Sequence, residues 1–228
     1  MATLRYRLQF NKNTFETQAW AQNQLVCGID EVGRGCLAGP VVVSAVILHP
    51  YAMSRLVKDS KALDALQRQK AYSWIIKNSW YSVAIVHNRT IDKVNIYQAT
   101  LIAMRRAALQ LGAIAPQNPH IFLVDAMPLL LANTQYHNNS VYYFPFGETK
   151  SISIAAASIV AKVSRDALMK RMDRYIPGYS FGKHKGYATP LHQESIKQVG
   201  PSLIHRVSFL PQNSPLHEEL HEEQQTLW

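Results

Sequence analysis

Short apolar runs alternate with longer amphipathic segments along most of this chain. Five runs have the length and the β-branched or aromatic content of strands, at residues 25–30, 41–48, 80–87, 120–126 and 141–146. Three longer segments repeat apolar residues near the helical period of 3.6, at residues 64–79, 90–111 and 151–175. A short helix is predicted to start at Thr189-Pro190 and to end before Gly200. Strands that alternate with helices predict an α/β domain.

The two ends of the chain depart from this pattern. Residues 1–24 are predicted to form an N-terminal extension, with a turn or two of helix at residues 14–22. The catalytic domain is expected at residues 25–212, and an acidic C-terminal tail at residues 213–228. A chain of 228 residues is long enough for one large domain with a substantial core.

Several predicted strands end in a carboxylate. Asp30 and Glu31 follow the first strand, Asp125 ends the fourth, and Glu148 follows the fifth. In α/β domains, functional groups gather at strand ends, although an acid there is also a common solvated turn former. Because adjacent strand residues point to opposite faces, Asp30 and Glu31 serve one site only if the strand bends or one acid reaches round.

A glycine-rich turn, Gly33-Arg34-Gly35, comes directly after Asp30 and Glu31. Glycines on both sides of a cation indicate that the backbone approaches a ligand closely. Carboxylates beside a turn with exposed backbone N–H groups suit a metal ion and a phosphate together.

Charge and composition narrow the class of partner. The formal net charge is +9, and eight basic but only two acidic residues lie between positions 150 and 190. Such a cluster is typical of a surface that binds a polyanion, although a solvated helix face is the simpler alternative. The segment at residues 179–189 mixes basic and aromatic side chains, which suits a nucleic-acid backbone with a stacked sugar or base.

Other features favour a cytoplasmic protein that does not enter a membrane. Apolar stretches are far shorter than the roughly 20 residues that span a bilayer, and the first residues lack the apolar region of a signal peptide. Cys27 and Cys36 are expected to be reduced thiols, and no Cys/His spacing predicts a zinc site.

The chain closely resembles bacterial ribonuclease HII over roughly residues 14 to 210. The resemblance rests on these segments, in the family's order: 28–35, 37–42, 59–61, 124–125, 153–166, 184–187 and 205–209. It implies an RNase H-like fold, with a central mixed β-sheet flanked by helices and a helical C-terminal part. It also implies an endonuclease that hydrolyses RNA in RNA·DNA hybrids and cuts 5′ of single ribonucleotides embedded in duplex DNA, as in ribonucleotide excision repair. The products would carry 5′-phosphate and 3′-hydroxyl ends.

The resemblance also implies a set of site residues. The family uses four carboxylates with manganese or magnesium, and the matching positions here are Asp30, Glu31, Asp125 and Glu148. A two-metal site of this kind activates water and stabilises the leaving oxygen. Substrate binding is implied for Gly33, Arg34, Gly35 and Tyr187, because in the family the glycine-rich turn reads the 2′-hydroxyl and a tyrosine stacks on the next sugar. Candidate phosphate contacts are Ser60, Lys61, Lys183 and Lys185. His184 is a candidate for protonating the leaving group, although a structural loop histidine is the favoured interpretation.

Two positions depart from the family pattern. The fourth acid is Glu148 where the family usually has Asp, and Ala126 stands where Gly is common. A glutamate at that position is similar to ribonuclease HIII, so an enzyme that prefers long hybrids is an alternative. A catalytically decayed hybrid-binding protein is another.

The last five residues, Gln224 to Trp228, look like the short peptide by which replication proteins dock into a bacterial sliding clamp. A frayed amphipathic end is the alternative. The resemblance leads us to expect a monomer. Metal preference, substrate preference and source organism do not follow from the sequence.

Overall fold

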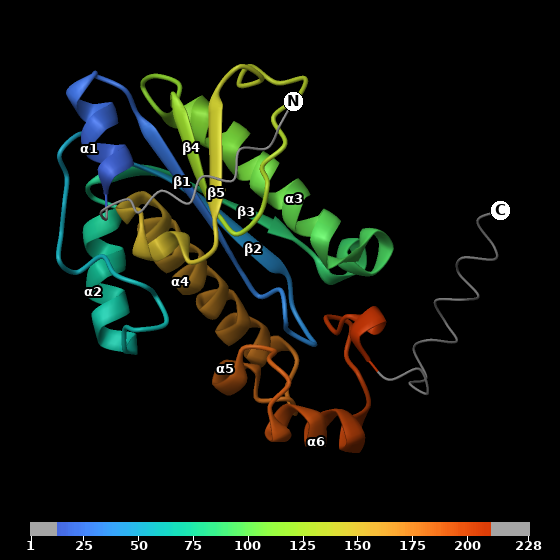
Figure 1. The fold of residues 1–228 in the computed structure, drawn as a ribbon. Helices are drawn as coiled ribbons and strands as arrows, with labels where there is room; N and C mark the ends of the chain where they lie inside the picture. The colour runs from blue at the N-terminus through green and yellow to red at the C-terminus, as the bar shows by residue number, and fades with distance from the viewer. Residues whose placement is uncertain (1–12, 211–228) are drawn as a thin grey trace.

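The computed structural model describes residues 13–210 (Figure 1). Five strands form one mixed sheet in the order β3-β2-β1-β4-β5. Their bounds are Val26–Val32 for β1, Val41–Leu48 for β2, Ser79–Val86 for β3, Ile121–Asp125 for β4 and Ser140–Phe144 for β5. Strand β1 is antiparallel to β2 and parallel to β4. All five predicted strands and the mixed sheet are therefore confirmed.

Helices cover both faces of the sheet and form most of the C-terminal part. Their bounds are Thr14–Ala21 (α1), Ala65–Ile75 (α2), Asn88–Ile114 (α3), Gly147–Thr149 (η1), Ile152–Tyr175 (α4), Phe181–His184 (α5), Pro190–Val199 (α6) and Val207–Phe209 (η2). Among the described residues, no helix is long and apolar enough to cross a membrane.

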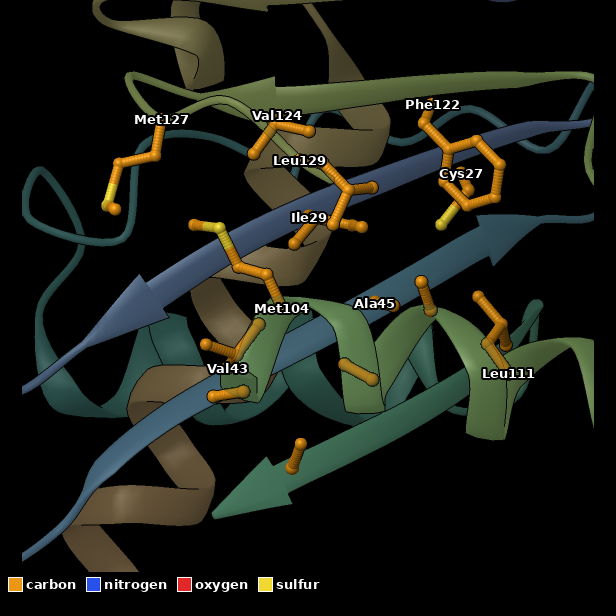
Figure 2. Packing of buried hydrophobic residues seen from close by; sticks show 14 of the residues in the cluster. Cys27, Ile29, Val43, Ala45, Met104, Leu111, Phe122, Val124, Met127 and Leu129 are labelled. Carbon is orange, nitrogen blue, oxygen red and sulfur yellow. The ribbon is translucent and has the colours of Figure 1, made fainter. Parts of the chain in front are cut away.

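The core lies on both sides of the sheet because strand residues alternate between its faces. Cys27 and Ile29 of β1 point toward α3, where they pack with Met104 (Figure 2). The even-numbered residues Gly28 and Asp30 therefore face α4, which runs across the other side of the sheet (Figure 1). Strand alternation therefore places Asp30, one of the predicted catalytic acids, on the side of the sheet that α4 covers.

Gly28 allows β1 and α4 to pack unusually closely. A Cβ atom at this position would lie 2.1 Å from the Ser153 carbonyl carbon and 2.4 Å from the Ile154 nitrogen. Both contacts are with helix backbone, which no side-chain rotation can relieve. The first turn of α4 is therefore held directly against the strand that carries Asp30 and Glu31.

Helix α1 fixes the start of α4 through a buried carboxylate. Glu16 is fully buried, and its Oε1 accepts hydrogen bonds from the Ser153 backbone N–H at 3.0 Å and from the Ser151 hydroxyl. Ser151 in turn caps α4 by accepting from the Ile154 backbone N–H. A negative charge at a helix N-terminus is favourable because the unpaired N–H groups there point toward it.

The structure differs from the sequence predictions in two helical details. Helix α3 begins at Asn88 rather than near Thr90, and it is kinked at Asn95, which has a positive φ of 65°. The Asn95 side chain accepts from the Gln98 backbone N–H at 3.0 Å and so caps the segment after the kink. A single turn of helix, α5, also forms within residues 179–189, where the sequence pattern predicts no helix.

Candidate active site

The four predicted acids line one cleft at the end of the central strands. Asp30 and Glu31 come from the end of β1, Asp125 from the end of β4, and Glu148 from η1. In the parallel ladder Ile29 pairs with Val124, and the same register continued by one residue sets Asp30 beside Asp125. Glu31 is the next residue along β1, so strand alternation alone would point it away from Asp30. It nevertheless lines the same cleft, so both adjacent acids belong to one site.

Backbone geometry after β4 and β5 positions Asp125 and Glu148. Ala126 has a positive φ of 52°, and the Gly147 backbone N–H donates to Asp125 Oδ1 at 2.7 Å. A Cβ on Gly147 would lie only 2.7 Å from the Ile154 side chain and 3.1 Å from Asp125 Oδ1. Glycine at 147 therefore lets η1 approach Asp125, and the next residue, Glu148, reaches the cleft.

The acids form a strongly electronegative group. Burial first, and then the charges of Glu31 and Asp125, raise the pKa of Asp30 well above its ordinary value. Burial also raises the pKa of Glu31, although Arg34, whose Nη1 lies 3.6 Å from Glu31 Oε1, opposes this shift. The pKa of Glu148 is raised mainly by burial. Each of these shifts reports a carboxylate whose negative charge is not fully compensated.

The donor set fits a hard divalent cation. Glu31 Oε2 and Glu148 Oε2 are buried, and neither has a hydrogen-bond partner among the described residues. Carboxylate oxygens with unsatisfied lone pairs are the ligands that Mg²⁺ and Mn²⁺ prefer. In the part of the chain that the structure describes, no three His, Cys, Asp or Glu side chains are arranged so that they could hold a metal ion together. The acids thus surround the cleft without converging on one point.

Two buried arginines hold the glycine-rich turn and the segment that follows it. Arg206 is fully buried and donates to the carbonyl oxygens of Gly33 at 2.5 Å, Arg34 at 2.7 Å and Gly39 at 3.0 Å. Arg165 is also fully buried, and it donates to three further carbonyl oxygens, those of Pro40, Lys185 and Ala38. Arg206 therefore fixes the backbone of the turn, whereas Arg165 binds the segment that follows the turn and the carbonyl of Lys185.

Tyr187 closes the cleft on the side of the glycine-rich turn. Its backbone forms an antiparallel bridge with Cys36, and the residue is 37% exposed. The guanidinium carbon of Arg165 and the ammonium of Lys162 each lie 5.8 Å from the centre of the tyrosine ring. A partly exposed aromatic ring beside two cations is suited to stack on a sugar or base of a nucleic acid.

The predicted phosphate contacts separate into two groups. Ser60 and Lys61 line the cleft, and the Ser60 hydroxyl lies 2.8 Å from that of Ser158. Lys183 and Lys185 lie outside the cleft lining, and the Lys185 ammonium donates to the carbonyls of Gly182 and Lys183. The structure therefore brings only the first pair to the acids.

Three further polar residues line the cleft and were not predicted as site residues: Arg68, Ser158 and Lys162. Ser158 forms a side-chain hydrogen bond with Asp30, which lowers the carboxyl pKa. Ser158 and Lys162 are four residues apart on α4, and this spacing on a helix packed at Asp30 is the signal that could have identified them.

His184 has a structural role, in agreement with the sequence interpretation. Its side chain is buried, Nδ1 accepts from the Gly186 backbone N–H at 3.1 Å, and Nε2 lies 2.7 Å from the Tyr179 carbonyl. Both ring nitrogens are therefore engaged within the protein.

Comparisons with known proteins show similarity to one enzyme family over most of the chain. The family model described as ribonuclease HII matches residues 27–211. Ribonuclease HII of Levilactobacillus brevis is 46% identical over 198 residues, which cover 86% of this chain and 73% of that protein. Ribonuclease HII of Caldicellulosiruptor bescii is 41% identical over 208 residues, which cover 90% of this chain and 97% of that protein.

Two solved structures share the fold. The PCNA:RNase HII complex from Archaeoglobus fulgidus superposes with a TM-score of 0.67 at 25% identity, covering 85% of this chain and 99% of the other. Bst-RNase HIII in complex with Mn²⁺ superposes with a TM-score of 0.67 at 20% identity, covering 91% of this chain and 73% of the other.

Proposed function

The chain belongs to the ribonuclease HII family, and on that premise we propose that Asp30, Glu31, Asp125 and Glu148 form its active site. The protein is a ribonuclease H, an endonuclease that acts on RNA–DNA hybrids. The observation that carries the proposal is the meeting of four acids from three separate segments in one cleft, with raised pKa values at Asp30, Glu31 and Glu148. Structural carboxylates are normally paired, so an unpaired group of this kind indicates a site for cations.

Mn²⁺ or Mg²⁺ is the expected cofactor, and a homologous structure was determined in complex with Mn²⁺. Asp30, Glu31, Asp125 and Glu148, which line the cleft, would hold the ions. When bound, such ions supply an activated water and stabilise the charge that develops on the leaving 3′-oxygen. The protein contributes the fixed positions: the Gly147 N–H orients Asp125, and the Ser158 side chain orients Asp30.

The family resemblance, together with the turn geometry, supports recognition of the ribose. The buried Arg206 donates to the carbonyl oxygens of Gly33 and Arg34. The turn can therefore present its N–H groups to a 2′-hydroxyl, which distinguishes RNA from DNA. Tyr187 would stack on the sugar of the following deoxynucleotide, so that a single ribonucleotide within duplex DNA is cut on its 5′ side. The products would carry 5′-phosphate and 3′-hydroxyl ends.

Positive charge along the cleft supports binding of the phosphate backbone. Lys61 and Lys162 flank the acids, and Ser60 offers a hydroxyl. Lys183 and Lys185 would contact phosphates further along the duplex. Replacing both of these outer lysines should flatten the salt dependence of binding by about two counterions without changing the cleavage position.

The C-terminal segment Gln224 to Trp228 lies outside the described residues. A homologue from Archaeoglobus fulgidus was solved as a complex with PCNA, a sliding clamp. We propose that this segment docks this protein on its own sliding clamp. Deletion of residues 224–228 should abolish clamp binding in calorimetry while cleavage of free duplex is unchanged. Absence of binding by the full-length chain would refute this proposal.

The deciding experiment compares two substrates, a DNA duplex with one ribonucleotide and a long RNA·DNA hybrid, each with Mg²⁺ and with Mn²⁺. We expect a cut 5′ of the single ribonucleotide, and loss of at least about 100-fold in rate for Glu148→Gln but not for Glu148→Asp, which keeps a carboxylate. Cleavage of the hybrid alone would favour an HIII-like preference, which Glu148 also suggests. Full activity of Glu148→Gln would remove this residue from the site.

A further inference from the structure

Three buried histidines lie behind Tyr187 in the C-terminal part of the chain. His184, His192 and His205 are at most 8% exposed, and the rings of His184 and His192 stack with their centres 4.2 Å apart. None of the three lines the cleft, and the proposed chemistry gives none of them a task. The hydrogen bonds of His192 and His205 nevertheless form one chain that links Ser202 to Tyr187.

The first step fixes the tautomer of His205. The Ser202 backbone N–H lies 2.8 Å from His205 Nδ1, and a backbone N–H can only donate. Nδ1 therefore carries no proton, and the Ser202 hydroxyl lies 2.8 Å from the same nitrogen. A neutral His205 must then hold its proton on Nε2, which lies 3.0 Å from Nε2 of His192.

The second step fixes the tautomer of His192. Its Nδ1 lies 2.9 Å from the Tyr187 carbonyl oxygen, which can only accept, so this nitrogen carries a proton. Nε2 of His192 is then free to accept the proton of His205. A second proton on either ring would set two N–H groups against each other, and both rings are buried in surroundings that lower their pKa values.

We propose that His192 is a positioning residue, which together with His205 forms an imidazole relay that runs from the Ser202 N–H to the Tyr187 carbonyl and holds Tyr187 in place to read the sugar beside a ribonucleotide. This proposal rests on the proposed function of Tyr187. The relay acts on the backbone of Tyr187 from one side, while the bridge to Cys36 holds it from the other. The Tyr187 ring is thereby kept over the cleft, close to Arg165 and Lys162.

The functional test uses a matched pair of variants. His192→Asn keeps an N–H donor near the position of Nδ1, whereas His192→Leu has similar bulk and no donor. We expect His192→Leu to lower kcat/KM on the single-ribonucleotide duplex by roughly tenfold relative to the long hybrid, and His192→Asn to recover most of that loss. In a Tyr187→Ala background, His192→Leu should have no further effect on the ratio of the two substrates. Equal losses on both substrates, or losses that add to that of Tyr187→Ala, would show a merely structural role and overturn the proposal.

Imidazole ¹⁵N NMR tests the relay without relying on activity. We expect opposite neutral tautomers near pH 7, with the proton on Nε2 of His205 and on Nδ1 of His192. A charged ring, or the same tautomer on both, would overturn the relay. If the wild-type protein does not cut the single-ribonucleotide duplex, the proposed reading function fails, and these spectra decide whether the relay itself exists.

Discussion

Replacing Gly28 by alanine tests how strictly the site depends on contact between β1 and α4. The added Cβ would lie 2.1–2.4 Å from backbone atoms of Ser153 and Ile154. Ordinary contact begins near 3.4 Å, so the helix would have to retreat by about 1 Å from a close-packed interface. Overpacking that side chains can absorb costs about 1–3 kcal/mol, and here only backbone can move. We expect Gly28→Ala to lower the free energy of unfolding by at least about 3 kcal/mol, a large share of a typical total.

Guanidinium chloride unfolding measures this change, with Gly35→Ala as the matched control because nothing lies within 4 Å of a Cβ there. The control should stay within about 0.5 kcal/mol of the wild type. Cleavage should also fall in Gly28→Ala, since α4 carries Ser158 and Lys162 at the cleft. A Gly28→Ala protein as stable as the control would show that the close approach of strand and helix is not required.

Three further changes follow from the site. Asp30→Asn removes a desolvated charge beside other acids, so the metal-free protein should melt at a higher temperature, with a smaller gain on adding Mn²⁺; a lower metal-free melting temperature would contradict the electrostatic argument. Ala126→Gly relieves a left-handed backbone and should raise the free energy of unfolding by about 0.5–1 kcal/mol in denaturant titration, whereas a loss would show that φ of 52° carries no strain. His205 has a pKa lowered to about 4 by burial, so the unfolded chain binds its proton more readily; the related stability should be complete above pH 6.5 and fall by up to about 3 kcal/mol toward pH 4. His205→Gln should flatten that part of the profile of unfolding free energy against pH, and an unchanged profile would assign the slope to other groups.

Local patterns predicted most of the elements because strand alternation and helical periodicity reflect short-range burial. The acids at the ends of β1 and β4 could also be predicted, since each directly follows an apolar run. The residues that pack around these acids could not be predicted in this way. Arg165 and Arg206 bind carbonyl oxygens of residues more than 100 positions away in the chain. The spacing of residues in the sequence does not reveal such pairs. The same holds for the contact of Glu16 with the start of α4.

Departures from the predictions have local physical causes. The kink at Asn95 arises because the side chain competes for a backbone N–H, a choice that periodicity does not reveal. Ala126 has the positive φ that glycine adopts with less strain. The backbone therefore keeps this conformation although alanine stands where the family commonly has glycine.

The Arg206 guanidinium that holds the glycine-rich turn also bears on the order in which the chain is made. Gly33 and Arg34 leave the ribosome early, whereas Arg206 is added near the end of the folded region. A nascent chain that stops before residue 206 already contains all four acids but lacks the donor that shapes the turn. Because domains fold as they emerge, we expect the turn to reach its final conformation only when the last described segment is in place.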